Sequence, residues 1–236
     1  MAVEVIDAPL RDKGEEVRAS KAPRGELRLG SYEVSSIVQH NTREGQALLS
    51  DVQPRPSTFY HLDFDLTQAL TREGDEKSGA REKSESAAAP KPWHATCVAE
   101  RRVAQNIDFA AAADESHDEV ALVCTLVDPR ASAWSLRAEG DVGRGLSGEV
   151  RGEEPETLAF SVEVLARRRF FGAVGRELPF PVVQLREERT ATAAMLLDTP
   201  ERAWFGPELE PERRSLALAV MVALRLLPLG ETALSR

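Results

Sequence analysis

The feature that most constrains this chain is a run of apolar residues close to its C-terminus. Residues 216–227 contain a single charged side chain, Arg225. The segment 210–212 places a proline between two acids where a helix begins, and Pro228 with Gly230 marks where it ends. A membrane span needs about 20 apolar residues, so this helix is too short to cross a bilayer. Because it is apolar nearly all round, we expect the protein to surround it.

Most of the remaining chain shows the alternation typical of half-buried β-strands. Residues 59–66 place four apolar side chains on one face: Tyr60, Leu62, Phe64 and Leu66. Residues 158–164 alternate in the same way, and further strand-like segments cover residues 93–103, 120–127 and 182–195. This order predicts a mainly β protein, an antiparallel barrel or sandwich with a buried C-terminal α-helix.

The domain organisation follows from two polar segments. Residues 1–25 predict a flexible N-terminal arm, in which Val3, Val5 and Ile6 offer at most a short edge strand. Residues 71–92 are rich in Glu, Lys, Ser, Gly and Ala and predict a disordered insertion. The region before that insertion is short and its strands need partners from beyond it. We therefore expect one β-rich domain, residues 26–236, rather than two domains.

The end of the chain resembles a known family. Its Ala203-Trp204-Phe205-Gly206 segment and the stretch Ser215-Leu216-Ala217-Leu218-Ala219-Val220-Met221-Val222-Ala223-Leu224 look like the terminal helix of the tubby-like superfamily. That superfamily includes LURP-one-related proteins and phospholipid scramblases. The resemblance implies a barrel that encloses the helix and a binding or scaffold role, sometimes at anionic lipid heads. It implies no catalytic residue.

The charge of the chain limits its partners and location. Acidic residues outnumber basic ones by 39 to 30, and a net charge of -9 repels a phosphate backbone, so we expect no nucleic-acid partner. The first 20 residues contain no long apolar run, so no signal peptide is expected and the predicted location is cytoplasmic. Two cysteines, Cys97 and Cys124, are too few for a disulfide framework or zinc site. We favour two buried thiols, with their pairing left open.

One strand carries the only pattern that suggests a metal. His61, Asp63 and Asp65 alternate and therefore point to the same face, as metal ligands supplied by a single strand must. The opposite face is apolar, so the same three residues are also what a solvent-facing strand surface requires. The favoured interpretation is the solvated surface, and the alternative is a metal-dependent hydrolase.

A second cluster combines cations with aromatic rings. Arg167, Arg168 and Arg169 precede Phe170 and Phe171, a combination that can bind a phosphate head group. Arginines at a strand end are more often solvated, and the net negative charge weakens attraction to anionic membranes. An anionic ligand at the three arginines is retained as a hypothesis.

The remaining motifs suggest no catalysis. Residues 143–148 match G-x-G-x-x-G, but no helix pattern follows, so a hairpin turn is favoured over a dinucleotide loop and no cofactor is expected. His94 lies three residues before Cys97, which places them on opposite faces of a strand and argues against a catalytic dyad. We predict a noncatalytic binding or assembly protein. The alternatives are the metal-dependent hydrolase and a structural component of a larger complex.

Overall fold

The computed structural model describes residues 6–21, 27–48, 57–68, 91–102, 118–141, 144–154, 157–165, 182–197 and 201–227. The two helices are α1 (Ala8–Lys13) and α2 (Pro211–Leu226). The strands are β1 (Glu15–Lys21), β2 (Leu27–Leu29), β3 (Tyr32–Thr42), β4 (Ser57–Gln68), β5 (Trp93–Arg102), β6 (Glu119–Val127), β7 (Ala133–Asp141), β8 (Gly145–Arg151), β9 (Leu158–Leu165), β10 (Val182–Glu187), β11 (Thr190–Leu196) and β12 (Arg202–Phe205).

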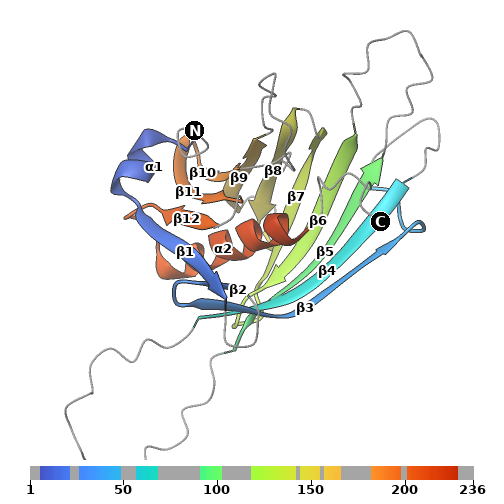
Figure 1. Ribbon diagram of the computed structural model, residues 1–236, viewed down its shortest axis with the longest axis horizontal. Helices are drawn as coiled ribbons and strands as arrows, with labels where there is room; N and C mark the ends of the chain where they lie inside the picture. The colour runs from blue at the N-terminus through green and yellow to red at the C-terminus, as the bar shows by residue number, and fades with distance from the viewer. Residues whose placement is uncertain are drawn as a thin grey trace, which may run out of the picture.

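These twelve strands form one closed antiparallel barrel around α2, which confirms the predicted mainly β class with a buried C-terminal helix (Figure 1). Each strand pairs with its neighbours in the sequence, and the pairing of β1 with β12 closes the ring. An even number of strands is what a fully antiparallel ring requires, because each strand must run opposite to both neighbours. The closed ring leaves no unpaired edge.

The interior of the barrel is filled by side chains of α2. Every residue from Leu216 to Leu224 is at most 3% exposed, and these residues belong to one core cluster with the inward faces of the strands. The strand alternation predicted from the sequence supplies those faces, as in Leu62, Phe64 and Leu66, each at most 1% exposed. The barrel is therefore a shell closed around its own helix.

The N-terminal region departs from the sequence prediction. Residues 15–21, which the sequence placed in a flexible arm, instead form β1 and pair with both β12 and β2. Only two of them, Val17 and Ala19, pack against the core, so the strand has too few apolar residues to show a clear period of two. The short helix α1 lies outside the ring, where Leu10 packs in a second apolar cluster with Leu196 and Trp204 (Figure 1).

Two local backbone features, a turn and a bulge, occur in the part of the barrel wall formed by β2 and β3. Gly30, in the turn between β2 and β3, has a φ of 59°, a left-handed conformation that glycine adopts at low cost. In β3 the register shifts between Ser35 and Val38, as a bulge produces. Beyond this bulge Gln39 pairs with the buried Leu62 and donates a hydrogen bond from its Nε2 to the Leu226 carbonyl at 2.6 Å. The bulge thus brings a side-chain donor to the C-terminal end of α2.

The predicted insertion, residues 71–92, lies outside the described residues apart from Lys91 and Pro92. Neither of the two helices in the described part of the chain is long and apolar enough to cross a membrane.

Candidate functional site

The helix α2 occupies the centre of this barrel. Barrels of open interior hold small ligands in a central cavity. Here the central space contains Leu218, Val220 and Met221, all 0% exposed. The surfaces open to other molecules are the ends of the barrel and its outer face.

The end where α2 begins is held by three consecutive ion pairs. Glu212 accepts from Arg130 in the turn between β6 and β7 at 2.5 Å. Arg213 pairs with Glu187 at the end of β10 at 2.6 Å. Arg214 pairs with Glu15 at the start of β1 at 2.5 Å. The first turn of α2 is thereby joined to three separate parts of the barrel wall.

A pocket of about 240 Å³ lies beside this first turn of the helix. Its wall combines the Glu15–Arg214 ion pair with apolar residues of the strands and of the connection into α2, and it is lined by Glu15, Val17, Leu29, Gly30, Ser31, Tyr32, Gln68, Phe205, Leu209, Pro211 and Arg214. The volume is below the range of about 300–1,000 Å³ that drug-sized ligands occupy. We name this cavity the rim pocket.

The three residues that suggested a metal lie on the outer face of β4, and each contacts a polar side chain of a neighbouring strand. Asp65 lies opposite His94 of β5, and their Oδ1 and Nδ1 atoms are 2.9 Å apart. Asp63 lies opposite Thr96, whose hydroxyl donates to Asp63 Oδ1 at 2.8 Å. His61 lies opposite His40 of β3, and the two rings stack with centroids 4.5 Å apart.

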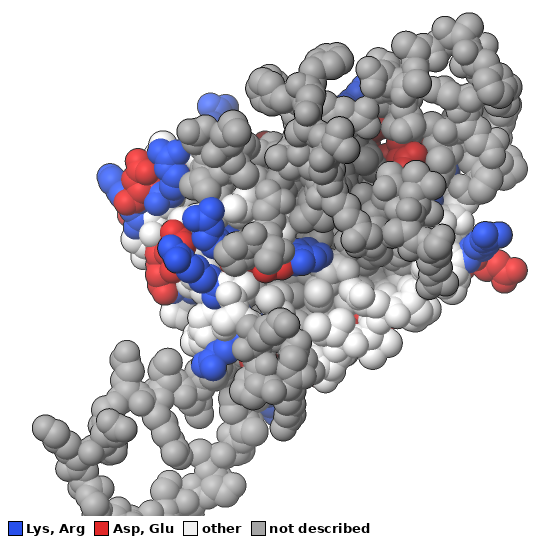
Figure 2. Space-filling model, in the orientation of Figure 1, with Lys and Arg blue, Asp and Glu red and all other residues white. Residues whose placement is uncertain are grey.

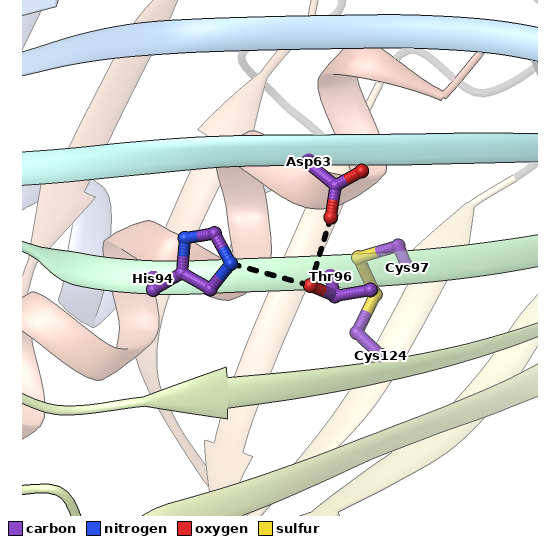
Figure 3. The surroundings of a disulfide bond; sticks show 5 residues. All are labelled: Asp63, His94, Thr96, Cys97 and Cys124. Atoms are coloured by element: carbon purple, nitrogen blue, oxygen red, sulfur yellow. Dashed lines mark hydrogen bonds between the residues drawn. A yellow bond between two sulfur atoms is a disulfide. The ribbon is translucent and has the colours of Figure 1, made fainter.

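Thr96 is the meeting point of this outer polar face. Its Oγ1 lies 3.4 Å from His94 Nε2 as well as 2.8 Å from Asp63, so it sits between the two side chains (Figure 3). Sequence spacing within one strand predicted the shared face of His61, Asp63 and Asp65. It could not identify His94 and Thr96, because their proximity depends on the register between β4 and β5.

The arrangement of Asp65, His94 and Thr96 resembles the order of groups in a nucleophile triad but lacks its chemistry. In such a triad the hydroxyl gives its proton to the histidine. Here the Thr96 hydroxyl donates its single proton to Asp63 at 2.8 Å, the shorter of its two contacts. Its oxygen is therefore not activated by His94 as a nucleophile.

The described residues contain no group of three or more His, Cys, Asp or Glu side chains that could hold a metal ion. The set His61, Asp63 and Asp65 is divided among three different contacts, with His40, Thr96 and His94. A metal at that set stays a prediction of the sequence.

Buried charges that the sequence pattern did not indicate lie near the other end of the barrel. Glu100 is 0% exposed and accepts from the Arg102 guanidinium at 2.9 Å and from the Ser57 hydroxyl at 2.6 Å. The Asp118 carboxylate accepts from Arg101 Nε at 2.9 Å, and both side chains are buried. Paired in this way, charges can remain in a low-dielectric interior.

The two cysteines form a disulfide rather than the two thiols that the sequence favoured. Cys97 of β5 lies directly opposite Cys124 of β6, and both are at most 1% exposed (Figure 3). His94 is on the opposite, outer face from Cys97, which confirms that the two do not form a dyad. The pairing of Cys97 and Cys124 depends on the register between β5 and β6, which the sequence did not reveal.

Described charged side chains of both signs lie close together on one part of the outer surface. At the end of the molecule where α1 and β1 lie, basic and acidic groups stand side by side (Figure 2), among them Arg11 with Asp12 and Arg18 with Glu16. Because positive and negative side chains alternate there, that surface does not form a patch of one charge that would attract a charged partner.

Two half-buried ion pairs shift the pKa values of their members. On β8 the hydrogen bond from Arg151 lowers the pKa of Glu149, against the smaller opposing effect of burial. For Arg186 of β10, burial acts to lower the pKa, but the hydrogen bond and charge of Glu163, together with Asp7, raise it above its usual value. Both pairs lie on the outer face and stabilise charges that are already favoured in water.

The remaining predicted sites are settled only in part. Gly145 and Gly148 of the G-x-G-x-x-G segment lie in β8, which pairs with β7 as a hairpin, as the sequence favoured. A Cβ atom at Gly148 would meet the Arg137 carbonyl oxygen, so the glycine permits the close approach of these two strands. Arg167, Arg168 and Arg169 lie outside the described residues, and an anionic ligand there stays a prediction.

Comparison with known proteins adds no relative. No family model matches the chain, and neither the curated proteins nor the solved structures contain a match.

Proposed function

We propose that this chain is a noncatalytic binding or assembly protein whose contacts with other molecules are made at the rim and on the outer face of the barrel. One observation carries the proposal, namely that the helix α2 fills the interior with side chains that are at most 3% exposed. A protein of this architecture presents a rigid closed shell rather than a central cavity. The contacts left for a partner are external.

The resemblance to the tubby-like superfamily supports the same proposal. A closed barrel around a C-terminal helix is the architecture that this resemblance implies. The residues that carry the resemblance lie in β12 and the residue after it (203–206) and in α2 (215–224). The role implied is binding or scaffolding. We propose a protein partner or an anionic ligand, without a nucleic-acid partner, because the net charge of -9 disfavours a phosphate backbone.

The experiment is purification of the tagged chain from cells in which it is native, followed by mass measurement in solution. The chain alone has a mass of 25.9 kDa, so a stable assembly is detected as a discrete larger mass with a second component in fixed ratio. We expect such an assembly and no turnover of generic ester or phosphoester substrates with or without added Zn²⁺ or Mn²⁺. A monomer whose metal-dependent hydrolysis is lost in Asp63→Asn would instead establish the enzymatic alternative.

A further inference from the structure

The rim pocket lies where the closing strand β1 pairs with one neighbour along each half of its length. Its first half, Glu15–Arg18, pairs with β12, and its second half, Ala19–Lys21, pairs with β2 (Figure 1). Glu15 and Val17 of the first half line the pocket together with residues 30–31, the turn after β2. The opening is therefore a consequence of how the ring is closed.

The walls of the rim pocket are apolar and are held in place by the core behind them. Leu29 and Phe205 are at most 1% exposed. The buried Tyr32 places its hydroxyl 3.2 Å from Ser215 Oγ, and Ser215 donates to the Pro211 carbonyl at 3.1 Å. Walls that are fixed before a ligand arrives lower the ordering cost of binding.

Arg214 is the cation of the rim pocket, and Glu15 satisfies it only in part. Its Nη1 donates to Glu15 at 2.5 Å, and its guanidinium carbon lies 5.3 Å from the centroid of the Phe205 ring. Within the described part of the chain, Arg214 Nε is enclosed and has no hydrogen-bond partner. An enclosed donor without an acceptor is unfavourable. A carboxylate that accepts two parallel hydrogen bonds suits this guanidinium better than the single contact with Glu15.

Glu15 is the group that an incoming anion would replace. Its side chain is 59% exposed, against 24% for Arg214, so its carboxylate can move into water while the guanidinium stays. An ion pair with so exposed a member contributes little stability. A carboxylate attached to an apolar body would keep Arg214 paired and would remove apolar surface from water against Val17 and Pro211 at the mouth of the pocket.

We propose that the rim pocket binds a small monocarboxylate with an apolar body, whose carboxylate replaces Glu15 as the partner of Arg214. The cavity of about 240 Å³ is smaller than the sites of drug-sized ligands, which selects a short-chain or single-ring acid. This ligand class rests on the proposed binding role at the rim. The two fail separately, because the assembly measurement decides the role and carboxylate binding decides the ligand.

The test is a titration of the full chain with sodium hexanoate, followed in ¹H–¹⁵N correlation spectra at constant ionic strength. We expect saturable shifts that include the amides of Gly30 and Ser31. Hexanamide, the neutral isostere, should bind about tenfold more weakly, because it lacks the charge that pairs with Arg214. Acetate should also bind about tenfold more weakly, because it lacks the apolar body.

The decisive variant removes the internal competitor. Glu15→Gln should tighten hexanoate binding by about two- to fivefold, the ratio that corresponds to the loss of an exposed ion pair, and should leave hexanamide binding unchanged. Glu16→Gln is the matched control, because Glu16 carries the same charge one residue away but pairs with Arg18 at 2.8 Å. It should leave both affinities unchanged.

A second pair of variants tests the cation. Arg214→Gln should weaken hexanoate binding by about tenfold or more, as loss of a charge-assisted hydrogen bond does. Arg213→Gln removes the same charge from the same turn of α2, where Arg213 pairs with Glu187, and should leave the affinity unchanged. Circular dichroism melts show whether each variant folds. If Arg214→Gln does not fold, the comparison of Glu15→Gln with Glu16→Gln decides alone.

Four results would overturn the proposal. They are the absence of saturable hexanoate binding in both the unmodified chain and Glu15→Gln, hexanamide or acetate binding as tightly as hexanoate, equal gains in Glu15→Gln and Glu16→Gln, or unchanged binding in a folded Arg214→Gln. Equal gains would mean that hexanoate responds only to the net charge of the chain.

Discussion

The inner and outer faces of β4 show how differently the two sides of this barrel contribute to it. On the inside, Leu62, Phe64 and Leu66 are almost completely removed from water, and burial of such a side chain stabilises the fold by about 1.5–3 kcal/mol. On the outside, Asp63 and Asp65 make hydrogen bonds to β5, where exposed polar pairs contribute about 0–1 kcal/mol. The interior thus determines whether the chain folds, while the outer face can vary with function.

The largest expected effect comes from a charge placed at the centre of α2. Leu218 is 0% exposed, so Leu218→Glu should prevent folding, because the carboxylate would have no partner in the core. Leu218→Ala should lower the free energy of unfolding by about 2–5 kcal/mol through lost burial and a residual cavity. Thermal and denaturant unfolding followed by circular dichroism provide the measurement.

The matched control lies on the outer face of β3. Val38 is 55% exposed and lies opposite Asp63, so Val38→Lys introduces a charge without a like-charged partner and should change the free energy of unfolding by less than about 0.5 kcal/mol. If Leu218→Glu melted within a few degrees of the unmodified chain, α2 would dock by one face only and the contrast between the two sides of the barrel would fail.

The same contrast explains what the sequence could predict. The inner faces follow a period of two, and α2 is apolar all round, so the fold class and the enclosed helix are readable from local patterns. The strand β1 could not be predicted from the sequence pattern, because only Val17 and Ala19 pack against the core. Its identity as a wall strand comes from closure of the ring with β12, which is a property of the whole barrel.

The polar contacts on the outer face could not be predicted from any single segment, because they depend on how the strands are paired. Asp65 and His94 are far apart in the chain, and their contact follows from the register of β4 against β5. Strand spacing placed His61, Asp63 and Asp65 on one face correctly, but it could not indicate that each has a different neighbour. Sequence alternation assigns a side chain to a face, whereas strand register assigns its partners.

A smaller effect is expected from the disulfide, which lies inside the barrel wall. The double variant Cys97→Ala/Cys124→Ala should lose about 2–4 kcal/mol of stability, because the bond closes a loop with a sequence separation of 27. Chemical unfolding with and without reductant is the measurement. Reductant should destabilise the unmodified chain but leave the double variant unchanged.

The oxidation state also bears on the predicted location. Disulfides persist in oxidising compartments and are rare in the cytoplasm, so this bond weighs against the cytoplasmic location predicted from the sequence. We expect no free thiol when protein taken from its native cells is alkylated under denaturing conditions. Two alkylated cysteines would show that the buried pair is reduced in those cells and would restore the cytoplasmic prediction.

The smallest expected effect belongs to the outer face of β8, where Glu149 and Arg151 form a bidentate pair at 2.6 and 2.7 Å. The pair lowers the pKa of Glu149 in the folded chain, so its contribution is present above the unfolded pKa and is lost as pH falls through the lowered value. Both side chains are about 40% exposed, so solvent screening keeps the contribution of the pair small. Glu149→Gln should therefore melt slightly below the unmodified chain at pH 7, and the difference should shrink as acid protonates Glu149. Melting curves from pH 7 down to about pH 3 test this sign, with the range set by the ordinary pKa of glutamate. A difference that grew on acidification, or one as large as that of Leu218→Ala, would show that the outer face contributes to folding as the interior does.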